Sequence, residues 1–428
     1  MEKVIHVVGA GLAGVEATHF LAKSGFEVHL HEQRPQRMTP AHHTEWFGEL
    51  VCSNSLKSNR LDNACGLLKE EMRSMDSLTM RIAQETSVPS GQALSVDRDM
   101  FAQRLTEEIR SFPNVIIHHE EITEIPDGIT ILATGPLTSD ALIATLSKIT
   151  GENNLSFFDA SSPIVEKDSI NFDKAYFKSR YEQDEGSYIN CAMNREEYEK
   201  FYNELINAKL VEKHEFDTGY FEGCMPVEVM AKRGVDTLRY GPLKPMGLRR
   251  TPEDRPYAVV QLRQDNVAGN LYNIVGFQTN LTYPEQKRVF GLIPGLENAN
   301  FVRYGLMHKN TYLKAPKVLD STLSLKKQKN IIIAGQLCGV EGYVESAATG
   351  ILAGVTAMRL FRQKPSKTLP LNTMLGALVN YITQCVPDNF SPMNANYGIL
   401  HGANKNNREQ MAEQSVEAIR KWWANIDE

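Results

Sequence analysis

The sequence predicts an α/β protein built on a parallel sheet, with a mixed α+β domain inserted into it. Short apolar strands occur near both ends of the chain, at residues 4–8 and 330–334, and each leads into a glycine-rich turn and a helix. This order is typical of Rossmann-like dinucleotide-binding folds. Between them, residues 166–300 are richer in Tyr, Phe and charged side chains, as expected for a separate domain.

The first strand leads directly into Gly9-Ala-Gly-Leu-Ala-Gly14, and a helical pattern follows it. The glycines permit a tight turn and close backbone approach, so that a pyrophosphate can rest on the helix N-terminus. A second strand, at residues 26–31, ends at Glu32, where an acidic side chain suits the ribose hydroxyls of an adenosine. The predicted dinucleotide-binding residues are Gly9, Ala10, Gly11, Leu12, Ala13, Gly14 and Glu32.

Two downstream motifs favour FAD over NAD as the tightly held cofactor. A strand at residues 130–133 ends in Ala-Thr-Gly135, as in two-dinucleotide-binding flavoproteins. The strand at residues 330–334 leads into a glycine turn and then an alanine-rich helix, whose positive N-terminus would stabilise a reduced flavin. The alternative is a purely structural helix cap. These motifs add Gly135, Gly335, Glu341, Gly342 and Tyr343 to the expected cofactor-binding residues.

The two glycine motifs lie far apart in sequence, so one FAD-binding domain must be assembled from both ends of the chain. The expected division is an N-terminal part (1–165), an inserted α+β domain (166–300) and a C-terminal part (301–428). Within the insertion, an amphipathic helix is expected at residues 195–206, with strands at 257–262 and 271–277. A last helix is expected at residues 408–423, with Trp422 and Trp423 packing against the core.

Bulk composition is that of an ordinary globular protein, with 42% hydrophobic and 23% charged residues in a chain of 428. No secretion signal is recognised at the N-terminus, and no apolar run is long enough to span a membrane. A cytoplasmic location without membrane attachment is therefore expected. The net charge of -6 gives no global sign of nucleic-acid binding, although a local basic patch would be enough for phosphate contacts.

Six cysteines occur, and none of them forms a close Cys-x-x-Cys pair. This spacing argues against a metal site and against a disulfide framework, so free thiols are expected. Cys224 precedes a helix expected at residues 227–232, and Cys52 precedes a Ser-Asn-Ser cluster that suits a helix start. A helix N-terminus can stabilise a thiolate, which makes either thiol a candidate for chemistry. The competing interpretation is a buried, inert thiol.

Further motifs match one known family nearly end to end. They are Thr39-Pro-Ala-His-His-Thr44, Glu49-Leu-Val-Cys-Ser-Asn-Ser-Leu56, Leu68-Lys-Glu-Glu-Met-Arg73, Val96-Asp-Arg98, Ala133-Thr-Gly-Pro-Leu-Thr138, Glu222-Gly-Cys-Met-Pro-Val-Glu228, Val260-Gln-Leu-Arg-Gln264, Ile293-Pro-Gly-Leu-Glu-Asn298 and Gly339-Val-Glu-Gly-Tyr343. Together they resemble the folate- and FAD-dependent tRNA (uracil-5-)-methyltransferases, which are related to the GidA flavoproteins. The resemblance implies transfer of a methylene unit from 5,10-methylenetetrahydrofolate to uridine C5, and its reduction to methyl by FAD hydroquinone formed with NAD(P)H.

The resemblance also implies roles for individual residues. Cys224 would add to uracil C6 as the nucleophile, and Cys52, beside the flavin, would remove the C5 proton. His308 would stack on the folate pterin. Cys191 matches a family cysteine and is expected to be structural. Cys65, Cys338 and Cys385 are expected to pack without a chemical role.

The expected target is the T-loop uridine of tRNA, which would become ribothymidine. Three alternatives stay open: the same chemistry on a ribosomal RNA uridine, a wobble-uridine carboxymethylaminomethyl enzyme, and a flavoprotein that binds RNA without modifying it. The wobble enzymes carry a long C-terminal helical extension that this sequence does not show, and a non-modifying protein would not need both thiols.

Overall fold

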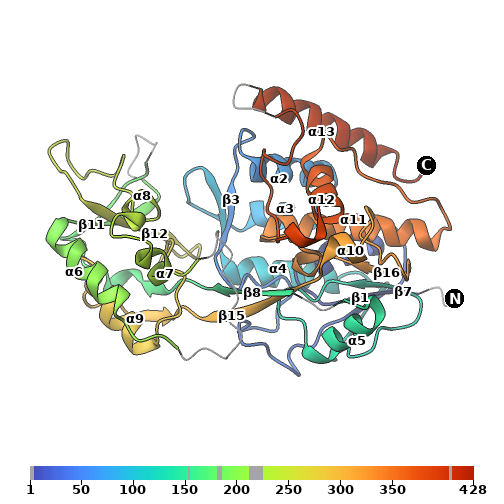
Figure 1. The fold of residues 1–428 in the computed structure, drawn as a ribbon, viewed down its shortest axis with the longest axis horizontal. Helices are drawn as coiled ribbons and strands as arrows, with labels where there is room; N and C mark the ends of the chain where they lie inside the picture. The colour runs from blue at the N-terminus through green and yellow to red at the C-terminus, as the bar shows by residue number, and fades with distance from the viewer. Residues whose placement is uncertain (1–3, 153–154, 181–185, 212–224, 404–406) are drawn as a thin grey trace.

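The main sheet is parallel and five-stranded, with the strand order β16-β7-β1-β2-β6 (Figure 1). The structure is a computed structural model that describes residues 4–152, 155–180, 186–211, 225–403 and 407–428. All four residues of β7 and all three of β16 are buried, as expected for apolar strands inside a parallel sheet. The strands are β1 (Ile5–Val8), β2 (Val28–His31), β6 (Val115–His118), β7 (Ile129–Leu132) and β16 (Ile331–Ile333).

Helices α1 (Leu12–Lys23) and α11 (Tyr343–Phe361) follow the two glycine turns and pack directly against each other. A Cβ added at Gly350 of α11 would lie 2.1 Å from the Ala13 carbonyl oxygen, so the two backbones are in close contact. The other helices packed around this core are α2 (Ala64–Ser74), α3 (Leu78–Glu85), α4 (Arg98–Arg110), α5 (Asp140–Thr150), α10 (Ala315–Val318), α12 (Met374–Gln384) and α13 (Arg408–Ala424).

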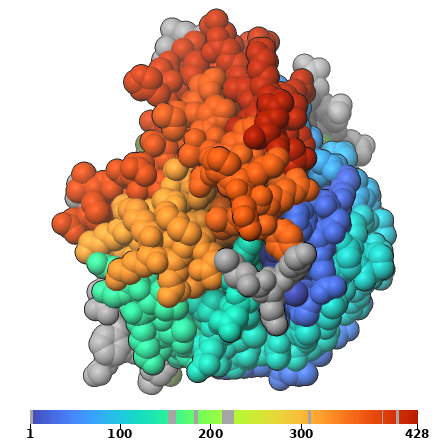
Figure 2. Space-filling view, turned by 90° about the vertical axis from the view of Figure 1, so that its right-hand side faces the viewer, coloured from blue at the N-terminus to red at the C-terminus, as the bar shows by residue number. Residues whose placement is uncertain are grey.

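Both ends of the chain build this part of the molecule. In Figure 2, the blue to teal N-terminal segments and the orange to red C-terminal segments adjoin on one continuous face. The buried core agrees, because residues 5–146 and 312–422 contribute to one hydrophobic cluster. Trp422 belongs to this cluster and Trp423 packs on Phe20, which confirms their expected packing role.

Four histidines lie side by side on one face of the parallel sheet. His6 Nδ1 is 3.0 Å from His31 Nε2, and His118 Nε2 is 3.0 Å from His29 Nδ1. His31 Nδ1 also lies 2.9 Å from Glu120 Oε1. The strand register brings the four rings together, because His6 pairs with His29 and His118 pairs with His31. We call these four residues the histidine ladder.

A second sheet has six antiparallel strands in the order β10-β11-β12-β13-β9-β14. Its helix α6 (Arg195–Ile206) begins with a capping box, in which Asn194 Oδ1 accepts from Glu197 N and Glu197 Oε2 accepts from Asn194 N. The strands are β9 (Ile164–Glu166), β10 (Ala175–Phe177), β11 (Tyr188–Met193), β12 (Ala258–Gln264), β13 (Leu271–Ile274) and β14 (Phe301–Arg303), and the remaining helices are α7 (Val227–Lys232), α8 (Thr237–Tyr240) and α9 (Tyr283–Phe290).

This second sheet has its own hydrophobic cluster, formed by residues between 165 and 299. In Figure 1 it lies to the left of the parallel sheet, and β8 (Leu155–Ala160) and β15 (Met307–Tyr312) run between the two parts as an antiparallel pair. The separate cores support the division at 166–300, which stays a proposal. A small sheet of β3 (Ser55–Ser58), β5 (Ala93–Val96) and β4 (Ser87–Val88) lies where the two parts meet.

The predicted α/β class is confirmed, and most expected elements form within two or three residues of their predicted bounds. One expectation is wrong: residues 53–55 do not start a helix, because the chain enters β3 there. The Asn54 side chain instead donates to the carbonyls of Val96 and Gln264, 2.9 Å away in each case. Across the described ranges, no helix is both long and apolar enough to cross a membrane.

Candidate active site

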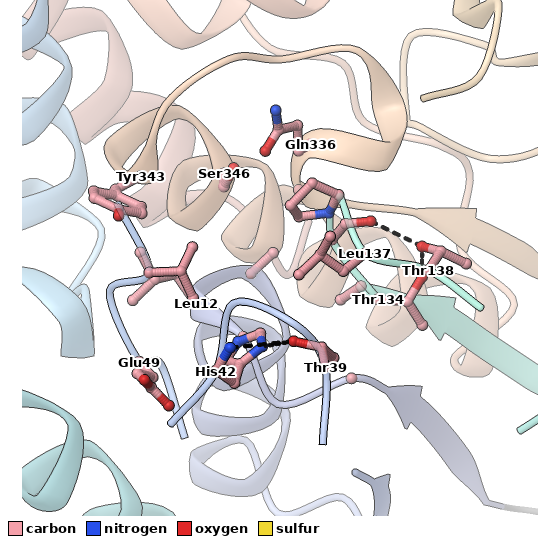
Figure 3. A pocket seen from close by; sticks show the side chains of 18 of the residues that line it. Leu12, Thr39, His42, Glu49, Thr134, Leu137, Thr138, Gln336, Tyr343 and Ser346 are labelled. Atoms are coloured by element: carbon pink, nitrogen blue, oxygen red, sulfur yellow. Dashed lines mark hydrogen bonds between the residues drawn. The ribbon is translucent and has the colours of Figure 1, made fainter. Parts of the chain in front are cut away.

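A cavity of about 370 Å³ lies at the carboxyl ends of the parallel strands. Ligands bind at this edge of open α/β sheets, because loops and helix N-termini converge there. Figure 3 shows Tyr343 and Ser346 of α11 on one side, Leu12 of α1 next to them, and His42 and Glu49 opposite. Among the residues expected at the cofactor or the chemistry, the cavity is lined by Gly9, Gly11, Leu12, Ala13, Glu32, Cys52, Gly135, Gly335, Glu341, Gly342 and Tyr343.

The first glycine turn is pressed against β7. Gly9 has φ +97°, and a Cβ there would lie 2.6 Å from the Ala133 carbonyl oxygen, so no other residue fits without movement. At Gly11 an added Cβ would meet nothing within 4 Å, because this position faces the cavity. Gly11 is also the N-cap of α1, and no side chain caps the helix. Its first amides are therefore available to an anion in the cavity.

The second glycine turn presents another uncapped helix to the same cavity. Gly342 is the N-cap of α11, has φ +120°, and provides no side-chain cap. Glu345 in the first turn is fully buried, and its Oε1 lies 3.3 Å from Lys57 Nζ. The two helix N-termini that the sequence placed at opposite ends of the chain thus meet at one cavity.

Glu32 is held rigidly at the end of β2. Its Oε2 accepts from Ala10 N at 2.9 Å, and its Oε1 accepts from Arg34 Nε at 2.9 Å. Burial alone would raise the pKa of Glu32, but the Arg34 guanidinium and the backbone amides outweigh burial, and the pKa is lowered. Arg34 is itself 2% exposed and also reaches Glu49. Neither Arg34 nor Glu49 has a role that the sequence predicts.

Four of the predicted site residues are not among the residues that line the cavity. Ala10 and Gly14 lie behind it and are buried. Cys224 lies outside the described residues, although α7, expected after it, is present at Val227–Lys232. The backbone of His308 belongs to β15, but its side chain lies outside the described part of the structure.

Cys52 lies in the cavity wall, directly beside the start of α11. The hydroxyl oxygen of Tyr343 accepts from the Cys52 amide at 2.7 Å and from the Ser53 amide at 3.2 Å. These bonds fix the turn that carries the thiol. The expected helix N-terminus at this thiol is absent, so a helix dipole of its own segment cannot stabilise a thiolate here.

Two buried arginines flank the same turn. Arg98 Nη1 donates to the Leu50 carbonyl at 2.6 Å, and Arg98 Nη2 lies 2.9 Å from Asp265 Oδ1. Arg263 of β12 donates from Nη2 to Ser53 Oγ at 2.8 Å and from Nε to Asn54 Oδ1 at 3.0 Å. Side chains from the FAD-binding part (Arg98) and from the inserted part (Arg263) therefore both form hydrogen bonds to the segment 50–54.

The other described cysteines are free thiols, as expected, and fit a packing role. Burial raises the pKa of Cys65 and of Cys338 to about 12 and also raises the pKa of Cys191. These three thiols therefore stay neutral and unreactive at neutral pH. Within the described ranges, no group of three or more His, Cys, Asp or Glu side chains has the geometry to hold a metal ion.

The residues present fit FAD. Two uncapped helix N-termini suit a pyrophosphate and a flavin edge, the open side of Gly11 leaves room beside α1, and Glu32 lies where an adenosine ribose would end. Other polar residues of the cavity were not predicted as site residues, because a polar side chain outside a glycine turn has no signal of its own in the sequence. They are Arg34, Thr39, His42, Glu49, Lys57, Thr134, Asn310 and Gln336.

This fold and cavity define the class: a two-dinucleotide-binding flavoprotein with a thiol at its cofactor site. A family profile described as "Glucose inhibited division protein A" matches residues 4–365. The chain belongs to this GidA family and, within it, to the folate- and FAD-dependent tRNA (uracil-5-)-methyltransferases of the TrmFO type. The family predicted from the motifs is confirmed.

The relatives are similar over nearly the whole chain. The "Methylenetetrahydrofolate--tRNA-(uracil-5-)-methyltransferase TrmFO" of Ligilactobacillus salivarius is 53% identical over 431 residues, covering 99% of each chain. Proteins of the same name from Bacillus licheniformis and Halalkalibacterium halodurans are 54% and 57% identical, the first covering 98% of this chain and 99% of its own length, the second 92% of each.

Among solved structures, two crystal forms of Aquifex aeolicus GidA superpose with TM-scores of 0.68 and 0.69 at 15% identity. Each covers 99% of this chain, and the match spans 75% and 77% of the GidA chains. At this identity the likeness concerns the fold alone.

Proposed function

We propose that this protein methylates C5 of the T-loop uridine of tRNA, with 5,10-methylenetetrahydrofolate as carbon donor and FAD, reduced by NAD(P)H, supplying the hydride that turns the methylene into a methyl group. The observation that carries the proposal is the position of Cys52, in the wall of a cavity formed by both cofactor turns. The TrmFO names of relatives at 53–57% identity support the tRNA substrate. Because the proposed substrate is tRNA, we also propose a cytoplasmic location.

The residues around the cavity would have separate roles in binding the cofactor and in the reaction. Gly11 and Gly342 present helix amides to the cofactor, and Glu32 accepts from its ribose. Uracil C5 is a poor nucleophile until a group adds to C6, and a thiolate suits that addition. We assign this step to the Cys224 sulfur.

A base must then remove the C5 proton close to the flavin. Among the described residues, Cys52 is the thiol that lines the cavity, and its backbone amide donates a hydrogen bond to the Tyr343 hydroxyl oxygen. Loss of the C5 proton lets the bond between the methylene carbon and the folate nitrogen break, so that tetrahydrofolate leaves and an exocyclic methylene remains on C5. After this methylene has received the hydride that the reduced cofactor would supply, the bond between the Cys224 sulfur and C6 breaks and the methylated base is released. The pterin would stack on His308, and the target base must leave its stacked loop to reach the cavity.

The purified, flavin-containing protein should be incubated with labelled 5,10-methylenetetrahydrofolate, NADH or NADPH, and unmodified tRNA or ribosomal RNA. Label in ribothymidine from tRNA is the expected result. Label only in ribosomal RNA would move the target and keep the chemistry. A wobble-base product, or no labelled nucleoside, would reject the proposal.

A further inference from the structure

We propose that Arg263 and Arg98 are positioning residues for Cys52: they hold the turn at residues 50–54 in the cavity wall, and their charges keep the Cys52 sulfur as a thiolate in the resting protein. The catalytic meaning of this thiolate, as the base for the C5 proton, rests on the function proposed above. The thiolate itself can be measured without RNA or folate.

Geometry carries the first part of the proposal. Arg263 bonds to both Ser53 and Asn54, and Arg98 bonds to Leu50, so hydrogen bonds reach the turn on both sides of Cys52. Both guanidiniums are nearly buried, at 6% and 7% exposure, and they come from α4 and from β12. A turn held by two rigid elements keeps its thiol in one place.

The charges of the two guanidiniums support a thiolate at Cys52. Arg98 is paired with Asp265, but Arg263 donates only to the neutral oxygens of Ser53 and Asn54, and within the described ranges no carboxylate forms an ion pair with it. The Asp265 carboxylate also attracts Arg263, but it is ion-paired with Arg98, so two buried guanidiniums share one carboxylate and a further negative charge close by is favoured. Burial accordingly lowers the pKa of Arg263. The Cys52 thiolate would supply the missing charge.

The electrostatic surroundings of Cys52 come from several elements. A negative charge on the Cys52 sulfur would favour the protonated forms of Arg98, Arg263 and Tyr343. Since such interactions are reciprocal, the guanidiniums favour the negative form of the sulfur. Several charged and titratable groups surround the turn. They are Asp97, the N-cap of α4, and Arg98 and Asp99 on α4; Tyr188 on β11; Arg263 on β12 and Asp265 after it; Arg303 on β14, which donates to the Val51 carbonyl; Glu49 and Lys57 on either side of the turn; and Glu341 and Tyr343 at the start of α11.

The arrangement replaces the helix dipole that the sequence suggested for this thiol. Thiolates in proteins are stabilised either at a helix N-terminus or beside cationic groups. At Cys52 the segment enters a strand, and cations from two distant segments take over. The charge at the thiol therefore depends on contact between β12 and the segment 50–54.

The test is the pH dependence of Cys52 alkylation by iodoacetamide in the purified, FAD-containing protein, followed by peptide mass spectrometry. Arg263→Met should raise the midpoint by about one pH unit, so that alkylation becomes about tenfold slower at pH values well below the wild-type midpoint. Arg263→Lys keeps the charge and should restore most of the rate. Asp265→Asn removes the counter-charge of Arg98 and should move the midpoint in the opposite direction.

Arg359→Met is the matched control, because Arg359 is a buried arginine at the far end of α11 that donates to the carbonyls of Pro365 and Ile426. It should leave the Cys52 profile unchanged. An unchanged midpoint in Arg263→Met overturns the proposal, and so does a shift of Asp265→Asn in the same direction, which would indicate general disruption. If the wild-type midpoint is low but no methylated RNA forms, the inference holds and the proposed function fails.

Discussion

Cys52 and Cys224 have different tasks in the proposed reaction, so their loss should have different results. Cys224 forms the bond to C6, whereas Cys52 acts after the methylene has been attached. In a 5-fluorouridine substrate the C5 proton is replaced by fluorine, so the complex cannot resolve and stays covalent.

Cys224→Ala should therefore give no covalent complex with 5-fluorouridine tRNA on a denaturing gel. Cys52→Ala should still form the complex, but on normal tRNA it should make ribothymidine at least about 100-fold more slowly, because a positioned base is lost. Cys385→Ala, at the half-exposed thiol that ends α12, is the control and should behave as wild type. A complex that persists without Cys224 would remove that residue from its role.

At the residue scale, the sequence identified the thiols but not the groups that surround Cys52. Cys52 lies in a motif that can be read along the chain. Arg263 is 210 positions away from Ser53, and its contact exists only because β12 packs against the turn. No periodicity or spacing in the sequence reports such a contact, so Arg98 and Arg263 were noted as parts of family motifs but were assigned no role.

At the scale of elements, the crossing of α1 and α11 forms the floor of the cofactor cavity. Gly350→Ala should destabilise the protein, because its Cβ would lie 2.1 Å from a backbone oxygen of α1. Gly354→Ala lies one turn further along the same helix, where the Cβ would meet the Phe20 ring at 2.8 Å, and a side chain can move.

Alanine is favoured over glycine to the same extent at both positions, so their difference isolates the helix contact. Gly350→Ala should be less stable than Gly354→Ala by about 2 kcal/mol and should lose flavin more easily. Urea denaturation and the flavin absorbance of the purified variants measure these effects. Equal stability of the two variants would show that α11 can shift without cost.

The elements themselves were largely predictable, because their patterns are local. β1 and β16 are continuous apolar runs, and α6 carries an amphipathic pattern and a capping box. The prediction failed after Cys52, where Ser53 and Asn54 are good helix caps but bond to β12 and to the Val96 carbonyl instead. Hydrogen bonds to residues distant in the sequence, Val96 and Arg263, favour the start of a strand over a helix cap at this position.

At the scale of the whole molecule, the histidine ladder should make stability depend on pH. Burial, followed by repulsion from His31, His29 and His118, lowers the pKa of His6 to about 4. Below its ordinary pKa of about 6.5, the unfolded chain binds a proton that the folded protein excludes. His6 therefore costs stability as the pH falls from about 6.5 to 4, and costs nothing above that window.

His6→Gln should lose less stability than wild type between pH 7 and pH 5, with a melting temperature on the order of 2 °C higher at the lower pH. His401→Gln, at an exposed loop position, is the control. Glu71, whose pKa is raised to about 7 by burial, acts in the opposite direction, but it is present in every variant and cancels in the comparison. Parallel pH curves for His6→Gln and wild type would contradict this account.

The cofactor cavity draws one wall from the first residues to be synthesised and another from the last quarter of the chain. A nascent polypeptide that has not yet passed Ile331 lacks β16, the edge of the parallel sheet, and all of α11. In such a polypeptide the wall of the cofactor cavity that α11 forms is missing. We therefore expect the flavin to bind only after α11 has been synthesised.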